Sequence, residues 1–312
     1  SMVLKVCDLI DGDARAAYKT TDLDLRQYKK LKMFVHAEKS KADQELEYGD
    51  LTCFIRLGAD FTENYYEYEI PLEFTPWGTS RANPDGIWPY NNRIEINLEE
   101  LVDVKHRRNI ASREGNSTVS TIIPYIEYMG RNKVTVLGVP SISDVRAIMI
   151  GVRNPKKASE TESEGKCAEI WVNELRLTDF NKDGGWAATA RVSADLADFG
   201  RIVVSGTHST SGFGSLEQKI NETQLEAITQ IDVATDLELG KFFPEESGIR
   251  IPMHFDYSQT VSNPEYNPLD PDIKLKDDLD SYDSKAKQDS VKRLAQNFTE
   301  RKSINFMNVR KD

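Results

Sequence analysis

An acidic motif at residues 179–184 has the residue types and spacing to bind a cation. Asp179-Phe-Asn-Lys-Asp-Gly184 matches the opening of a calcium-binding loop, in which alternate oxygen ligands surround the ion and glycine permits a sharp turn. The position that should supply the bidentate Glu is Ala190. A plain turn between two domains is the simpler account, so we assign no metal ligand and leave calcium binding open.

Carboxylates and aromatic rings gather between residues 65 and 90. Glu67, Glu69 and Glu73 share one face of a predicted strand, and paired carboxylates are the machinery of glycoside hydrolysis. A solvated strand face explains them more simply. The aromatic residues could form a sugar-stacking platform, although core packing and loop anchoring explain most such clusters. They are Tyr65, Tyr66, Tyr68, Trp77, Trp88 and Tyr90.

Other catalytic patterns do not occur in the sequence. The four histidines are His36, His106, His208 and His254, and none has ligand spacing to a Cys or to a second His. The chain has no nucleophile elbow, no phosphate-cradling glycine loop and no Ser/His/Asp cluster in a recognisable context. We therefore predict a protein that is not an enzyme, with no catalytic residue, no cofactor and no metal.

Composition narrows the class further. The 312 residues suffice for two domains, and the net charge of −11 argues against a nucleic-acid partner. No run of about 20 apolar residues could form a membrane-spanning helix. Cys7, Cys53 and Cys167 are odd in number, so at least one thiol is free or has its partner elsewhere, and Cys53 is expected to be a buried structural thiol.

The strongest pattern is an alternation of apolar and polar residues between Trp186 and Tyr257. It forms four runs, and each predicts a strand with one apolar and one polar face. A half-solvated sheet in a soluble protein would give the same alternation. The connections favour strands of an outer-membrane barrel, because the tight turn 198–200 and the short link 244–248 alternate with the long segments 211–230 and 261–302.

This interpretation assigns each alternating residue to one of two environments. The residues expected to face lipid are Val192, Ile202, Val204, Val233, Leu237, Leu239, Ile251, Met253, Phe255 and Tyr257. The residues expected to face a wet lumen are Arg191, Asp195, Asp232, Asp236, Glu238, Arg250, His254 and Asp256. Aromatic residues at strand ends would suit interfacial girdles. These are Phe199, Phe242 and Phe243 beside the short turns, with Trp186 and Tyr257 near the long loops.

Residues 1–180 predict a separate, mostly β domain. Alternation indicates strands at 30–38, 51–57 and 66–74, and further strands are expected at 133–138, 145–153 and 167–177. Asn97 and Glu100 form a capping box that starts a helix, and the basic run 105–108 is expected to be its solvated end. Many short strands with one inserted helix favour a jelly-roll-like β-sandwich.

Linkers and loops complete the predicted organisation. Residues 156–166 are expected to be a mobile loop, and the domain boundary is placed at 181–185. Residues 181–312 would then hold partial barrel wall strands with long loops. In the last long segment, prolines are expected to prevent regular structure at first, and a helix is predicted from about Ser284 to Glu300.

Four motifs resemble one family closely. They are Glu169-Ile-Trp-Val-Asn-Glu-Leu-Arg-Leu-Thr-Asp-Phe180, Gly184-Gly-Trp-Ala-Ala188, Leu237-Glu-Leu-Gly-Lys-Phe-Phe-Pro244 and Asn263-Pro-Glu-Tyr-Asn-Pro-Leu-Asp-Pro-Asp272. The ending 301–310 fits the same pattern, whereas residues 1–166 carry weaker motifs. The chain resembles the SprA and Sov family, the giant outer-membrane translocon of the type IX secretion system, also described as gliding-motility cell-surface proteins.

The resemblance implies a very large single-chain β-barrel that conducts proteins across the outer membrane. Its implied partners are secreted cargo proteins, other type IX secretion components and outer-membrane lipid. Family members are several times longer, so this chain is expected to be an internal fragment. If the short turns face the periplasm, residues 1–180 would form an extracellular cap, because the first strand ends at such a turn. The alternatives are a secreted carbohydrate-binding jelly-roll module and a glycoside hydrolase.

Overall fold

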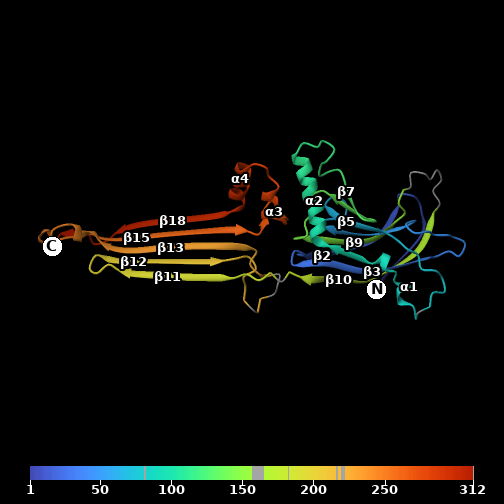
Figure 1. Cartoon of the computed structure of the whole chain (residues 1–312), viewed down its shortest axis with the longest axis horizontal. Coiled ribbons are helices and arrows are strands. Elements are labelled where there is room, and N and C mark those ends of the chain that lie inside the picture. Colours follow the sequence, from blue (N-terminus) through green and yellow to red (C-terminus); the bar gives the residue numbers. More distant parts are fainter. Residues whose placement is uncertain (81, 157–164, 182, 216, 219–221, 312) are drawn as a thin grey trace. The chain divides into compact units, whose positions relative to one another are not determined.

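The computed structural model describes residues 1–80, 82–156, 165–181, 183–215, 217–218 and 222–311. The chain divides into two compact units, unit 1 (Ser1–Asn181) and unit 2 (Lys182–Asp312). Both consist mainly of antiparallel strands with few helices (Figure 1), which confirms the predicted fold class. The loop predicted to be mobile, 156–166, falls largely outside the described residues.

Unit 1 contains two antiparallel sheets. The four-stranded sheet has the order β1 (Met2–Leu9), β10 (Lys166–Phe180), β3 (Tyr28–Lys39) and β6 (Ile94–Asn97). The six-stranded sheet has the order β2 (Ala14–Leu23), β9 (Val145–Arg153), β4 (Thr52–Gly58), β5 (Tyr65–Pro71), β8 (Asn132–Leu137) and β7 (Tyr125–Met129). Apart from the β7–β8 hairpin at the edge of the six-stranded sheet, the two sheets together have the strand order of a jelly roll. The first strand, β1, lies beside the last, β10.

The core of unit 1 is formed by apolar residues at alternating positions of its strands. Met33 and Val35 of β3 and Ile55 and Leu57 of β4 are each no more than 2% exposed. Burial of one such side chain contributes about 1.5–3 kcal/mol, so these alternating positions supply much of the driving force for folding. The sequence pattern located them correctly because strand side chains alternate between the two faces.

Helix α2 (Leu98–Arg113) differs from its prediction at its basic run. The Asn97 side chain caps the helix by accepting a hydrogen bond from the Glu99 N–H, but the helix continues past residues 105–108. Lys105 and Arg108 are at most 1% exposed, and they donate hydrogen bonds of 2.7 and 2.6 Å to the Pro140 and Gly138 carbonyls. The expectation of a solvated helix end was wrong, because these cations fasten α2 to the segment after β8. Two short elements, α1 (Pro84–Ile87) and η1 (Tyr90–Asn92), precede β6.

Unit 2 is built on one five-stranded antiparallel meander (Figure 1). Its strands follow chain order as β11 (Ala187–Asp195), β12 (Gly200–Ser209), β13 (Glu226–Glu238), β15 (Pro252–Pro264) and β18 (Asn297–Phe306). The β13–β15 connection holds η3 (Leu239–Phe242), η4 (Glu245–Ser247) and β14 (Ile249–Arg250), which pairs with β19 (Arg310–Lys311). The β15–β18 connection holds β16 (Tyr266–Asn267), β17 (Asp270–Lys274), α3 (Leu275–Asp280) and α4 (Lys285–Ala295).

The last long segment is more regular than the sequence predicts. β15 extends to Pro264, and the β16–β17 hairpin and α3 follow at once, although Pro264, Pro268 and Pro271 lie there. Helix α4 ends at Ala295 rather than near Glu300, because the chain then enters β18. The sequence did not predict β18. Its apolar face holds Phe298, Ile304 and Phe306, but Glu300 and Lys302 lie on the same face and interrupt the alternation.

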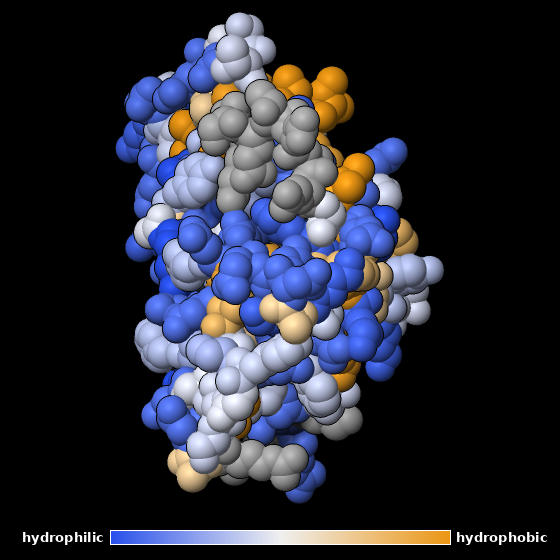
Figure 2. All heavy atoms as spheres, turned by 90° about the vertical axis from the view of Figure 1, so that its right-hand side faces the viewer, coloured by the Kyte–Doolittle hydropathy of each residue, from blue (hydrophilic) through white to orange (hydrophobic). Residues whose placement is uncertain are grey.

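One face of the molecular surface shows little sign of a large apolar site. The face seen in Figure 2 is largely hydrophilic, and its apolar residues gather in a few small groups. Scattered apolar residues are normal on protein surfaces and need no functional explanation. A functional apolar surface must therefore be sought where neighbouring strands bring such residues together.

A two-faced sheet as the candidate functional site

Strand register brings the alternating residues of unit 2 onto two distinct faces. Residues directly opposite in an antiparallel pair share a face. Val192 lies opposite Val204, Val204 opposite Val233, and Val233 opposite Tyr257. The same register places the other apolar residues of the sheet on this face, which we call the apolar face. Its predicted members in the sheet are Val192, Ile202, Val204, Val233, Leu237, Met253, Phe255 and Tyr257.

In the described part of unit 2 the apolar face is exposed or half-exposed, except at Thr235. Val192 is 67% exposed, Val204 41%, Ile231 43% and Ile304 59%. All residues of β11 are exposed, and Ser209, Thr235 and Ser262 are the buried positions in the other four strands. A soluble half-buried sheet would hide this face against a second layer. The apolar residues of unit 2 are therefore arranged for contact with something other than water.

The opposite face, which we call the polar face, is hydrogen-bonded across the strands. His254 lies opposite Asp236, and its ring bridges two carboxylates, with Nδ1 2.5 Å from Asp236 and Nε2 2.8 Å from Asp256. Ser258 donates to Asp232 at 2.7 Å. The predicted lumen residues found on this face are Arg191, Asp195, Asp232, Asp236, Glu238, His254 and Asp256. Such a face is suited to a hydrated environment.

Three residues assigned from the sequence lie outside the five-stranded sheet. Leu239 belongs to η3, Arg250 to β14, and Ile251 joins β14 to β15. Their segment departs from the sheet because the Glu238 carboxylate accepts hydrogen bonds from the Gly240 and Ile251 N–H groups, which turns the chain there. The connection 239–251 is consequently longer than the link predicted at 244–248, although the 196–199 connection is as tight as expected.

Aromatic residues flank the apolar face at both ends. Phe199 and Phe242 make an edge-to-face contact at 5.1 Å beside the short connections, and Trp186 lies 5.0 Å from His208 at the other end. On β18, Phe298 and Phe306 stand at opposite ends of the same face. Eight strand steps of about 3.3 Å separate them, a span of roughly 26 Å, close to the apolar band of about 25 Å on membrane barrels. Tyr257 lies at mid-strand opposite Val233, so its placement near the long loops was wrong.

Polar residues enter the apolar face at its β15–β18 side. Glu300 and Lys302 form an ion pair at 2.8 Å, and the Lys302 ammonium lies 5.5 Å from the centre of the Tyr257 ring. The Tyr257 hydroxyl donates to Gln259 at 2.7 Å. These groups satisfy one another, which reduces the cost of placing them on an otherwise apolar surface.

The carboxylates of unit 1 form a structural ion cluster. Glu67 and Glu69 are each 3% exposed, and the Arg153 guanidinium contacts both, with 2.9 Å to Glu67. Arg56 also pairs with Glu67, and Lys133 with Glu69. The expectation of a solvated face was wrong for these two, because β4, β8 and β9 bring cations over them. Glu73 lies beyond the end of β5 and accepts a hydrogen bond from Asn91.

The aromatic cluster of unit 1 is mostly core. Tyr65, Tyr66 and Tyr68 are no more than 7% exposed, and Trp88 packs near Phe34 and His36. Trp77 and Tyr90 remain exposed, at 54% and 75%. The Lys39 ammonium lies 5.6 Å from the Trp77 ring centre, and Arg93 lies 5.4 Å from the Tyr90 ring centre. Trp77 and Tyr90 are separate rings, each with a cation nearby. They offer less surface for stacking on a sugar than the six aromatic residues indicated by the sequence.

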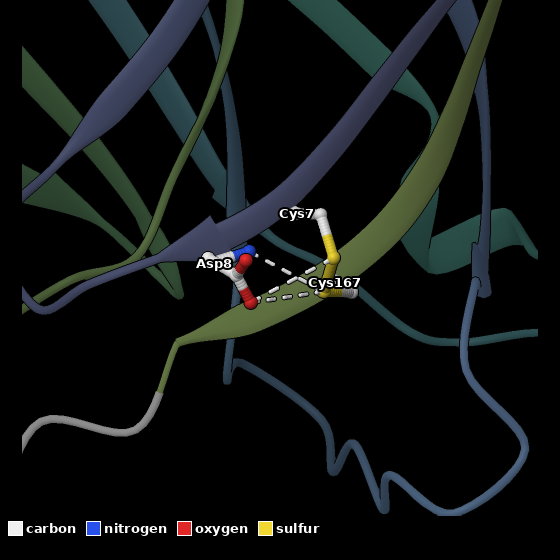
Figure 3. A group of neighbouring side chains, drawn as sticks. All are labelled: Cys7, Asp8 and Cys167. Atoms are coloured by element: carbon white, nitrogen blue, oxygen red, sulfur yellow. Dashed lines mark hydrogen bonds between the residues drawn. A yellow bond between two sulfur atoms is a disulfide. The ribbon is translucent and has the colours of Figure 1, made fainter.

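A disulfide joins the first and last strands of the jelly roll (Figure 3). Cys7 of β1 is bonded to Cys167 of β10, and Cys53 is a buried free thiol. The Asp8 N–H donates to the Cys167 sulfur at 3.3 Å, within a register shift between Val6 and Leu9. In the described residues, the one cluster with metal-ligand geometry is Cys7, Asp8 and Cys167, whose sulfurs are already bonded to each other. Asp179 of the calcium-like motif lies in β10, and Lys182 lies outside the described residues.

The disulfide and the buried thiol give a first testable prediction. Burial raises the pKa of the Cys53 thiol to about 12, so little reactive thiolate forms at neutral pH. We expect the folded chain, purified without reductant, to show no fast-reacting thiol with a colorimetric disulfide reagent. Denaturation alone should expose one thiol, and denaturation after reduction should expose three. A folded chain that reacts rapidly at two cysteines would contradict the disulfide.

The fold defines a mainly β protein in which a jelly-roll unit precedes a two-faced antiparallel sheet. The chain belongs to the SprA N-terminal family, described as motility-related or secretion proteins, whose family model matches residues 1–279. The match spans unit 1 and most of unit 2, including residues 1–166, where the sequence motifs are weaker, and it confirms the predicted family. A role related to motility or secretion follows from this membership. No match was found among curated proteins. Of the helices in the described ranges, none combines the length and apolar character that crossing a membrane requires.

Proposed function

We propose that this chain forms part of the wall of a protein-conducting channel in the outer membrane, which serves type IX secretion and gliding motility. The observation that carries the proposal is the exposed or half-exposed apolar face of the five-stranded sheet, opposite a hydrogen-bonded polar face. Lipid would contact the apolar face, and secreted proteins would pass along the polar face. Aromatic residues at both ends of the face support this arrangement, as interfacial girdles do in membrane barrels.

The open edges of the sheet support a role within a larger wall. β11 pairs only with β12, and β18 pairs with β15 alone in the described part of the sheet. Exposed edge strands readily pair with further strands, and closed barrels remove such edges. Five strands cannot close a barrel around a passage wide enough for a protein, so transport belongs to a longer assembly in which other strands continue both edges.

Unit 1 is proposed to be an extracellular cap. The chain enters β11 at the end of the sheet that carries the connections 210–225 and 265–296, and it leaves β11 at the tight turn. Short turns face the periplasm in membrane barrels, so the segment before β11 would be extracellular. The Cys7–Cys167 disulfide supports placement outside the cytoplasm, since disulfides persist in oxidising compartments.

The proposed function is transport, in which no covalent bond is made or broken. The two carboxylates that could have served glycoside hydrolysis are buried and neutralised by Arg56, Lys133 and Arg153. A general acid needs a raised pKa, whereas the pKa of Glu67 is lowered. The partners proposed are secreted cargo proteins, other type IX secretion components and outer-membrane lipid, with no nucleic acid.

Cargo crosslinking tests the channel proposal directly. A photoreactive amino acid placed at Ala234 lies on the polar face, and the same group at Val233 lies on the apolar face one residue away. In actively secreting cells, we expect crosslinks to cargo proteins from position 234 at a level at least about tenfold above those from position 233, because only one face borders the passage. Equal cargo crosslinking from both positions, or from neither, would contradict the proposal.

A further inference from the structure

A cavity of about 680 Å³ lies in unit 2 between α3, α4 and the end of β15. Its volume is within the range typical of small-ligand sites. Six charged residues line it, three basic and three acidic, and all of them are exposed except Glu265, which is half-buried. They are Lys274, Lys276, Lys292, Glu265, Asp280 and Asp289.

These six charges do not neutralise one another. None of them forms an ion pair or a side-chain hydrogen bond with any described residue. Some other exposed charges in the described chain do pair, as Lys30 does with Glu95 and Arg146 with Asp144. Three cations and three anions around one cavity therefore remain available to a ligand, and the lining carries no net charge.

This charge pattern selects for a zwitterion. A simple anion would gain contacts with the lysines but would be repelled by the carboxylates. A simple cation would be attracted by the carboxylates but repelled by the lysines. A ligand that carries both signs can satisfy both sets at once through charge-assisted hydrogen bonds. A phosphate group would bind the ammonium groups, and a primary ammonium would donate to the carboxylates.

The cavity is continuous with the rim of the apolar face. Asn263 and Gln296 line it and are hydrogen-bonded to each other. By register, Asn263 shares the side of the sheet held by Tyr257, and Gln296 lies two residues before Phe298 of the same face. If lipid covers the apolar face, this rim lies at the level of lipid headgroups, beside an aromatic girdle.

We propose that this cavity binds the phosphoethanolamine headgroup of an envelope lipid. The proposal rests on the proposed function for the location of the ligand, but its charge argument stands on the cavity alone. Lys274, Lys276 and Lys292 receive the phosphate, and Glu265, Asp280 and Asp289 receive the ammonium. Phosphatidylcholine, whose quaternary ammonium cannot donate hydrogen bonds, should bind less well.

Vesicle binding of the whole 312-residue chain tests this site. We expect about tenfold tighter binding to phosphatidylcholine vesicles that contain phosphatidylethanolamine than to vesicles of phosphatidylcholine alone. The variant K274Q/K276Q/K292Q should lose this preference, and so should E265Q/D280N/D289N. The matched control K285Q/K287Q, which removes two exposed lysines of α4 outside the cavity lining, should keep it. An unchanged preference in both cavity variants would overturn the proposal.

Soluble ligands separate failure of the site from failure of the proposed function. We expect O-phosphoethanolamine to shift the NMR signals of the cavity residues in the wild-type chain and not in K274Q/K276Q/K292Q. If the chain bound no vesicle of any composition but kept these shifts, the ligand site in the cavity would be supported and the proposed contact of the sheet with lipid would be contradicted. If glycine shifted the same signals as strongly as O-phosphoethanolamine, the site would be one for amino acids or peptide termini, and the headgroup proposal would be wrong.

Discussion

Replacing Val233 by Arg should prevent most of the full-length protein from assembling in its membrane. Val233 lies in the middle of the apolar face, in the row formed by Val192, Val204 and Tyr257. An Arg on the lipid face of a barrel near the bilayer midplane costs about 2–4 kcal/mol of folding free energy. That is roughly 30-fold to 1,000-fold in the ratio of folded to unfolded protein.

The matched control for this substitution is Ala234→Arg. Ala234 is the next residue on β13 and lies on the polar face, opposite Asp256. A guanidinium there meets carboxylates and water, so the expected change in folding free energy is within about 1 kcal/mol. The measurement is the amount of correctly assembled protein in outer-membrane fractions for the two variants. Equal losses in both, or no loss in Val233→Arg, would contradict a lipid-facing apolar face.

Replacing Arg153 by Ala should destabilise unit 1 strongly. Arg153 lies between two buried carboxylates, with Nη1 2.9 Å and Nη2 3.0 Å from the Glu67 oxygens. Removing one partner of a buried ion cluster leaves uncompensated charge and costs about 3–5 kcal/mol. Urea unfolding should show this loss. The control Arg146→Ala, on the same strand but in an exposed pair with Asp144, should change the unfolding free energy by less than about 1 kcal/mol.

The ion cluster of Arg153 with Glu67 and Glu69 also determines how the destabilisation by Arg153→Ala depends on pH. Burial alone would raise the pKa of the Glu67 carboxyl, but the hydrogen bonds and charges of Arg153 and Arg56 outweigh burial and lower the pKa below its ordinary value of 4.5. A lowered folded-state pKa contributes stability above about pH 4.5 that is lost as the pH falls through the folded-state value. The difference in unfolding free energy between wild type and Arg153→Ala should therefore shrink as the pH is lowered below 4.5. A constant difference from pH 7 to pH 3 would show that Arg153 acts through packing rather than through charge.

Strand alternation made much of the fold readable from the sequence. β3, β4 and β5 in unit 1, and β11, β12 and β13 in unit 2, each place one parity of residues on one face. β1, β2, β6 and β7 were missed, because they lie at the sheet edges or are short, and partial burial there leaves no clear alternation. Their pairing partners are far away in the chain, as Met2 is from Val172.

The burial of charged residues could not be read from the sequence. Glu67 and Glu69 alternate like solvated residues, and their partner Arg153 lies on β9, brought over them only by the sheet. Lys105 and Arg108 form a basic run typical of a helix end, yet both reach backbone carbonyls of the segment after β8. The Cys7–Cys167 bond depends in the same way on the register of β1 and β10. In each case the sequence supplies the group, and the tertiary structure alone supplies its partner.

The same limit applies to the candidate site. The two faces of the sheet were predicted residue by residue, since alternation needs no knowledge of neighbouring strands. The charged cavity beside α3 and α4 was missed, because its six charged residues are spread from 265 to 292 without a common spacing. The register that aligns Val192, Val204, Val233 and Tyr257 in one row also required the structure.

Lipid accessibility along β15 distinguishes a sheet that faces the membrane from one that is covered by protein. Single-cysteine spin labels would be placed at successive positions from 253 to 258 in the full-length protein within its native membrane, with Cys7, Cys53 and Cys167 replaced. We expect strong lipid contact for labels at Met253, Phe255 and Tyr257, and contact with water instead for those at His254, Asp256 and Ser258. Lipid contact at none of the six positions would mean that protein covers the apolar face, and the sheet would then belong to a soluble assembly rather than to a membrane wall.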